Sequence, residues 1–175
     1  MVLLALALAA CGRQAPAAPP PTTDATTTQA ATDFGDTARA FVELAIATDE
    51  QAVKLLDAGV ERAVDPALRE LAGELAAVRR TEMHELHTLL EAAGVPFVNN
   101  HVGHDMPGMP TDTELTTLTE AAAGFDAEFA RLVRAHLEES AVVARSAAES
   151  VEHPETKAAA MRMAEERAAA LARLS

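Results

Sequence analysis

The sequence has no tryptophan, no tyrosine and a single cysteine, and each of these shortages limits the structures that it can form. A chain with one cysteine forms no disulfide within itself, so its stability must come from packing. Aromatic residues make up only 3% of the 175 residues, whereas 49% are hydrophobic, so the core must be built from Leu, Val, Ala, Met and five Phe. This composition is typical of a helix bundle, and the length fits one compact domain with a tail.

Positive charge is also scarce, with 14 Lys and Arg against 27 Asp and Glu and a net charge of −13. This balance opposes binding to nucleic acid or to an anionic membrane through a basic face, and it attracts cations. The sequence contains no phosphate loop, no dinucleotide fingerprint and no nucleophile–base pairing. A dinuclear oxidase of the four-helix type would need carboxylates on every helix and paired Glu-x-x-His motifs, and the sequence has no such pair of motifs. We therefore expect that the protein is not an enzyme and has no nucleic-acid partner.

The first residues predict export from the cytoplasm. Residues 1–10 form an apolar stretch that is too short to span a membrane and is typical of a signal peptide. Residues 8–12, LAACG, resemble the bacterial lipobox, in which the cysteine becomes the lipidated N-terminus, so Cys11 is the expected lipid attachment site. Residues 11–32 are rich in Pro, Thr and Ala and hold no large apolar residue, which predicts a disordered tether. The expected location is the extracytoplasmic face of the cell envelope, anchored to the membrane by lipid, with plain secretion as the alternative.

From residue 33 onward the hydrophobic pattern has a helical period. We expect one helix over about 33–56, ended by Gly59, and a second that begins at Asp65-Pro66 and ends at Gly94. A capping box, Thr111 to Glu114, opens a long third helix that Gly124 can kink, and a fourth follows Pro154. In that fourth helix the expected inward residues are Met161, Ala164, Ala168 and Leu171. The prediction is an all-α fold over 33–175, an antiparallel four-helix bundle made of two helical hairpins.

Three polar residues fall on the apolar stripes of these helices. Asp49 lies between Ala45, Ala52 and Leu56, Glu82 is in line with the leucines of the second helix, and His136 lies among Phe129, Leu132 and Val143. A buried ionisable group needs a partner, so the three side chains should pair with one another, keep water or bind a metal. A structural role remains open, because a long side chain can reach solvent and a buried histidine commonly hydrogen-bonds a carboxylate.

The long break between the second and third helices concentrates potential soft metal ligands. Residues 101–110, HVGHDMPGMP, include His101, His104, Met106 and Met109. Thioethers prefer Cu(I), and unlike cysteine they are not lost to disulfide formation in an oxidising compartment. The alternative is a plain connector in which the methionines cover the end of the bundle. A further pair, His84 and His87 with Glu91, occupies the outer face of the second helix and is more typical of a solvated face.

Two segments, FVELAIATDEQAV (41–53) and FARLVRAHLEESAVVA (129–144), resemble the two copies of a repeated motif in the bacterial family called domain of unknown function 305. The resemblance implies a secreted or envelope-attached, ferritin-like bundle associated with copper. The motif carries a pair of adjacent histidines. Thr48 and Asp49 replace the first pair, whereas His136 keeps one position of the second pair and Leu137 replaces the other, so the chain resembles a degenerate member.

These observations support two hypotheses. The first is a lipid-anchored protein that binds or buffers metal, most simply a copper ion, outside the membrane, through Met and His of the break or through Asp49, Glu82 and His136. The second is a degenerate helical bundle that binds no metal and serves a structural or protein-interaction role.

Overall fold

The computed structural model describes residues 33–174, which belong to one compact unit. The expected signal peptide (1–10), Cys11 and the tether (11–32) lie outside the described residues. Within 33–174 the fold is all-helical, as predicted, with five helices and no strand. They are α1 (Gly35–Arg62), α2 (Pro66–Ala92), α3 (Asp112–Glu120), α4 (Phe125–Ser150) and α5 (Pro154–Arg173).

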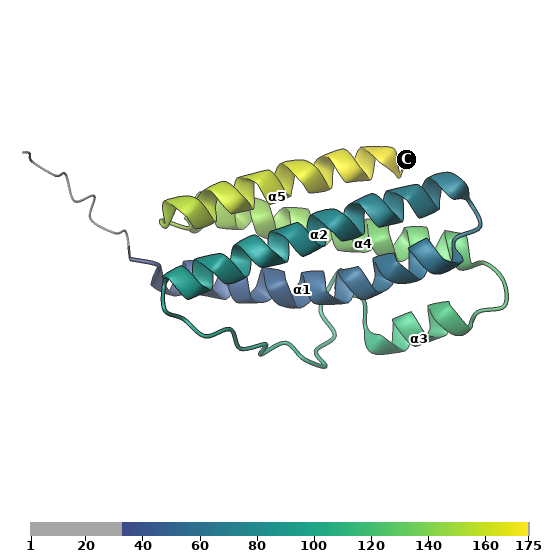
Figure 1. Ribbon diagram of the computed structural model, residues 1–175, viewed down its shortest axis with the longest axis horizontal. Coiled ribbons are helices and arrows are strands. Elements are labelled where there is room, and N and C mark those ends of the chain that lie inside the picture. The colour runs from purple at the N-terminus through teal and green to yellow at the C-terminus, as the bar shows by residue number, and fades with distance from the viewer. Residues whose placement is uncertain (1–32, 175) are drawn as a thin grey trace, which may run out of the picture. The chain divides into compact units, whose positions relative to one another are not determined.

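The four long helices lie side by side, and the short α3 lies outside them against α1 and α4 (Figure 1). α1 and α2 form one hairpin and α4 and α5 form the other, each with a tight turn. Residues 93–111, here called the connection, join α2 to α3 and run along the outside of α1 (Figure 1). The connection therefore lies where it can contact side chains from both hairpins.

Helix starts follow the predicted capping signals. The Asp65 side chain accepts a hydrogen bond from the Ala67 N–H, with Pro66 at the first helical position. Thr111 and Glu114 form the reciprocal capping box that opens α3. These local bonds satisfy amide groups that a helix start would otherwise leave unpaired.

The expected long third helix is wrong, because it is broken into α3 and α4 at residues 121–124. Gly124 adopts φ 75°, a left-handed conformation that glycine reaches without strain, and it starts α4 rather than kinking a continuous helix. The break also has a tertiary role. The Asp126 carboxylate in the first turn of α4 accepts hydrogen bonds from the backbone N–H groups of Val64 and Asp65, which join α1 to α2.

Gly59 does not end α1, which continues for three residues to Arg62. Instead, Gly59 is a point of close approach, since a Cβ atom there would overlap the ring of Phe129 on α4. The glycine is needed for packing between helices rather than for ending one.

Hydrophobic residues form two core clusters, one toward each end of the long helices. The inward face of α5 differs from the prediction, because Met161 is 52% exposed and Ala168 is also exposed. The buried positions of α5 include Ala160, Met163 and Arg167. Alanine repeats along this helix give little contrast between its faces, so the hydrophobic period there is weak.

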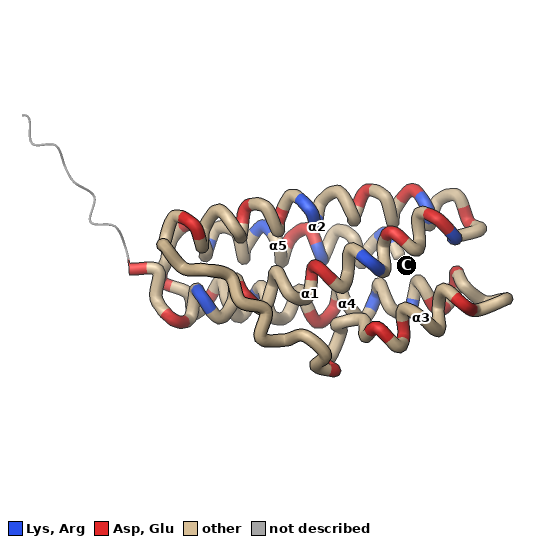
Figure 2. Tube along the Cα trace, turned by 60° about the horizontal axis from the view of Figure 1, so that its bottom comes forward, with Lys and Arg blue, Asp and Glu red and all other residues tan. Residues whose placement is uncertain are grey.

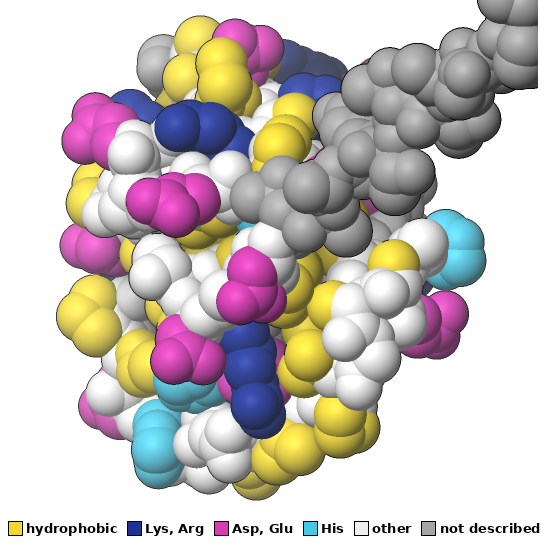
Figure 3. All heavy atoms as spheres, turned by 90° about the vertical axis from the view of Figure 1, so that its left-hand side faces the viewer, with side chains coloured by type: hydrophobic (Ala, Val, Ile, Leu, Met, Phe, Trp, Pro, Cys, Tyr) yellow, Lys and Arg dark blue, Asp and Glu magenta, His cyan; other side chains and the backbone are white. Residues whose placement is uncertain are grey.

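Acidic residues are spread along the long helices (Figure 2). In the connection Asp105 is the one Asp, Glu, Lys or Arg residue. Seen from the end at which α1 and α5 begin, acidic side chains are scattered among hydrophobic, basic and histidine side chains (Figure 3). None of the helices within residues 33–174 is both long and apolar enough to cross a bilayer.

Candidate metal-binding site

A cluster of charged side chains lies between the two hydrophobic clusters. The structure brings together the three inward polar residues expected from the sequence, Asp49, Glu82 and His136, and adds two arginines, Arg79 and Arg167. Each of the five is at most 7% exposed. They come from four different helices, so all four long helices contribute to this cluster.

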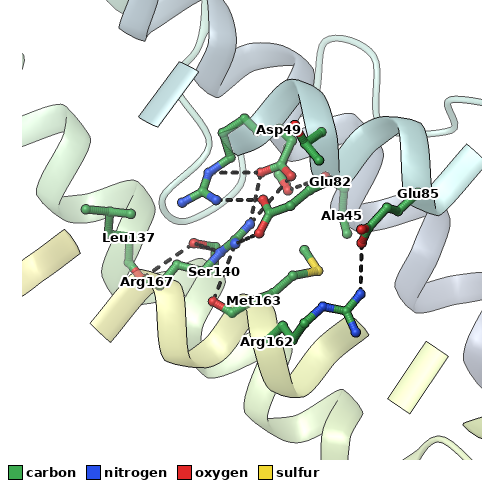
Figure 4. A network of polar contacts seen from close by, with 12 residues as sticks. Ala45, Asp49, Glu82, Glu85, Leu137, Ser140, Arg162, Met163 and Arg167 are labelled. Atoms are coloured by element: carbon green, nitrogen blue, oxygen red, sulfur yellow. Dashed lines mark hydrogen bonds and ion pairs between the residues drawn. The ribbon is translucent and has the colours of Figure 1, made fainter. Parts of the chain in front are cut away.

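The arginines bridge the two carboxylates (Figure 4). Nη1 and Nη2 of Arg167 donate to Glu82 Oε1 at 2.5 Å and to Asp49 Oδ1 at 3.2 Å. Nη1 of Arg79 donates to Glu82 Oε2 at 2.6 Å, while its Nε lies 3.6 Å from Asp49 Oδ1. Two buried cations thus face two buried anions, which is the condition under which buried charge is tolerated.

The pKa values of the two carboxyl groups in the cluster are shifted in opposite directions. Burial raises the pKa of Asp49 to about 7, against the lowering effect of the two arginines. Burial also acts to raise the pKa of Glu82, but the charges and hydrogen bonds of Arg79 and Arg167 prevail and lower it to about 2. Glu82 is therefore the carboxylate that is firmly ionised, and Asp49 is the one that titrates near neutrality.

His136 is held neutral within this cluster. Burial, together with the charges of Arg79 and Arg167, lowers the pKa of its imidazole to about 3. Its Nδ1 lies 3.3 Å from the carbonyl oxygen of Gly108 in the connection, so the neutral ring donates there. Its Nε2 is 3.7 Å from Asp49 Oδ1 and has no hydrogen-bond partner among the described residues. This nitrogen keeps an available lone pair.

The charged cluster fits a metal ion poorly. Both carboxylates already have cationic partners, and a further cation would face the two guanidinium groups. Within residues 33–174 no group of three or more His, Cys, Asp or Glu side chains has the arrangement of a metal site. Of the three possibilities considered for the buried polar groups, namely pairing, bound water or bound metal, the cluster matches pairing, and the two arginines are the partners of the carboxylates.

The connection supplies side chains to three cavities among the described residues, and two of these cavities also contain a histidine. The first has a volume of about 220 Å³ and lies between α1, α4, α5 and the connection. Met106, Met163 and His136 line it, together with apolar side chains such as Phe41 and Val143. The second, about 390 Å³, lies between α1, α2 and the connection, and Met83, His101 and Met109 line it. Each of these two cavities combines a methionine of the connection, a methionine of a helix and a histidine, whereas the third, about 170 Å³, contains Met106 and Met109 but no histidine and no helix methionine.

The remaining histidines of the sequence are not brought into these cavities. His104 is exposed, with its ring centroid 6.1 Å from that of His101. On the outer side of α2, His84 and Glu91 are exposed, and His87 packs edge-on against Phe97 at 5.0 Å. His87 therefore has a packing role.

Four functional candidates were missed from the sequence: Arg79, Arg167, Met83 and Met163. A signal existed for Arg79, which lies at helical spacing between Leu75 and Glu82 on the buried face of α2. Met83 and Met163 gave no comparable signal, because their proximity to the connection depends on where the connection crosses the helices.

The fold and these residues can be compared with known proteins. The family model described as "Domain of unknown function (DUF305)" matches residues 36–175. The chain belongs to the DUF305 family. No curated protein matches the sequence.

Solved structures of DUF305 proteins share the fold. A DUF305 fragment from Deinococcus radiodurans is 18% identical with a TM-score of 0.70, covering 80% of this chain and 93% of that one. A DUF305 protein from Streptomyces coelicolor, described as a putative secreted protein, is 21% identical with a TM-score of 0.71, covering 79% and 89%. CopM in its Cu(I)-bound form is 20% identical with a TM-score of 0.65, covering 77% and 90%. At these identities the likeness concerns the fold.

Proposed function

We propose that this DUF305 protein binds copper as Cu(I) outside the cytoplasmic membrane, as a binding or buffering protein rather than an enzyme. In this proposal Cys11 carries the lipid anchor, and the four long helices form an antiparallel, ferritin-like bundle with α3 as an addition. A structure described as a secreted protein and one described as Cu(I)-bound are among the similar folds, which supports both the location and the metal.

The observation that carries the proposal is the course of the connection. It places Met106 in the first cavity and Met109 in the second, and each of these two cavities also presents a helix methionine and a histidine. Thioether sulfur and imidazole nitrogen form a soft donor set that suits Cu(I). Uncharged sulfur and nitrogen donors would hold the singly charged Cu(I) ion, whereas a harder ion would need carboxylate ligands.

The test is anaerobic titration of the protein with Cu(I) against a colorimetric Cu(I) chelator. It uses a Cys11→Ser background, so that no thiolate contributes. We expect the protein to withdraw copper from the chelator in stoichiometric amounts.

A variant of the connection, with His101, His104, Met106 and Met109 all replaced by Ala, should lose this capacity. The matched control replaces Met161, His84 and His87 by Ala, since these residues lie outside both cavities, and it should keep the capacity. If the chelator retains all the copper with the parent protein, a structural or protein-interaction role replaces the proposal.

A further inference from the structure

The two cavities differ in the charges around them. Arg167 lines the first cavity, and His136 there lies beside both arginines of the buried cluster. A cation approaching His136 Nε2 would lie near the two guanidinium charges that, together with burial, keep this imidazole from binding a proton, and the nearby carboxylate of Asp49 is already paired with Arg167. Glu139 lines the same cavity but is exposed, so water screens its charge more strongly than that of the buried guanidinium.

The second cavity is more favourable to a cation. Glu50 and Asp112 line it, with Lys54 as the only basic residue of its lining. Lys54 is paired with Asp112 at 3.5 Å, which leaves the charge of Glu50 without a cationic partner in the lining. Gln51 lines the same cavity, and its Oε1 is buried without a hydrogen-bond partner among the described residues. An unpaired buried oxygen here suits a bound cation or its water.

The potential ligands of this cavity are held by the fold. Met83 lies within α2, and Met109 is only 5% exposed at the end of the connection. His101 is fixed through its neighbour, because the side chain of Asn99 accepts its backbone N–H and donates to Glu50 Oε2 at 2.9 Å. Through this hydrogen bond Glu50 joins the connection to α1 beside His101. Ligand binding therefore costs little further conformational entropy.

We propose that Met83, His101 and Met109 bind Cu(I) in the cavity between α1, α2 and the connection, with Met83 as the ligand contributed by a helix. The proposal rests on the proposed function and specifies its site. Two thioethers and one imidazole are neutral donors, so the bound ion keeps its positive charge beside Glu50. Binding would join the connection to α2 through the metal.

The experiment compares Met83→Leu with Met163→Leu in the Cys11→Ser protein. Both substitutions replace a thioether by a hydrocarbon of similar volume, and each removes sulfur from a different cavity. We expect Met83→Leu to weaken Cu(I) binding, measured by chelator competition, by at least about tenfold, whereas Met163→Leu leaves it unchanged. X-ray absorption should show one sulfur neighbour fewer around copper in Met83→Leu, and no such loss in Met163→Leu.

Thermal denaturation without copper shows whether each variant is folded, and Met109→Leu provides a second test of the same cavity from the connection. Weaker binding in Met163→Leu with full binding in Met83→Leu and Met109→Leu would overturn this inference and assign copper to the other cavity. Full binding in all three variants would also overturn it. Failure of the parent protein to bind Cu(I) would instead refute the proposed function itself.

Discussion

Removing Arg167 should destabilise the protein strongly, because it would leave two buried carboxylates facing a single cation. Arg167 is fully buried and bonds both Asp49 and Glu82. Replacing it by Met keeps much of the side-chain volume but breaks the compensation, and breaking a buried ion pair in this way lowers the free energy of unfolding by about 3–5 kcal/mol. For a domain of this size the melting temperature should fall by roughly 10–15 °C.

The chain offers a matched control on the same helix. Arg162 pairs with Glu85 at 2.8 Å, but both side chains are about half exposed, at 53% and 49%. Arg162→Met should therefore lower the free energy of unfolding by less than about 1 kcal/mol. Urea denaturation followed by circular dichroism measures both variants. If Arg167→Met loses no more stability than Arg162→Met, the description of the cluster as a compensated set of buried charges is incorrect.

Two further predictions concern pH and packing. Between about pH 4 and 6.5 the imidazole of His136 is protonated in the unfolded chain but stays neutral in the folded protein, so His136 makes the free energy of unfolding fall as the pH falls. Asp49 has the opposite effect. Its carboxyl binds a proton in the folded protein below about pH 7 but in the unfolded chain only near pH 4, so it makes the free energy of unfolding rise as the pH falls from 7 to 4. Relative to the parent, Asp49→Asn should therefore lose stability and His136→Gln should gain it as the pH falls from 7 to 4, by up to about 1.4 kcal/mol per pH unit. Urea denaturation at several pH values measures this, and the same pH dependence of the free energy of unfolding in all three proteins would contradict the assignment. Gly59→Ala should lower the free energy of unfolding by roughly 1–3 kcal/mol through overlap with Phe129, while Gly73→Ala, whose added methyl meets only ordinary contact, should raise it by about 0.4–1 kcal/mol; equal melting temperatures for the two variants would refute the packing argument.

The sequence predicted features that depend on local chemistry. The starts of α2 and α3 follow from Asp65-Pro66 and the Thr111 capping box, because a cap is formed by residues within one helical turn. The buried trio of Asp49, Glu82 and His136 followed from helical spacing alone, since a side chain on an apolar stripe must face the core.

Features that depend on distant parts of the chain were missed. Arg167 was not among the inward residues expected for the fourth helix, because arginine is usually exposed, and only the facing carboxylates on α1 and α2 make its burial possible. The break before α4 depends on Gly124 adopting a positive φ, supported by Asp126 binding the backbone of the α1–α2 turn. Met83 and Met109 line the same cavity because of where the connection crosses the helices.

In the proposed function the soft side chains around the connection hold Cu(I), and the buried charged cluster does not. Copper K-edge X-ray absorption of the Cu(I)-loaded protein, in the Cys11→Ser background, distinguishes these two sites by the atoms bound to the metal. We expect a first coordination shell that contains thioether sulfur together with imidazole nitrogen. A shell made only of oxygen and nitrogen atoms, or no copper retained after removal of excess metal, would contradict it.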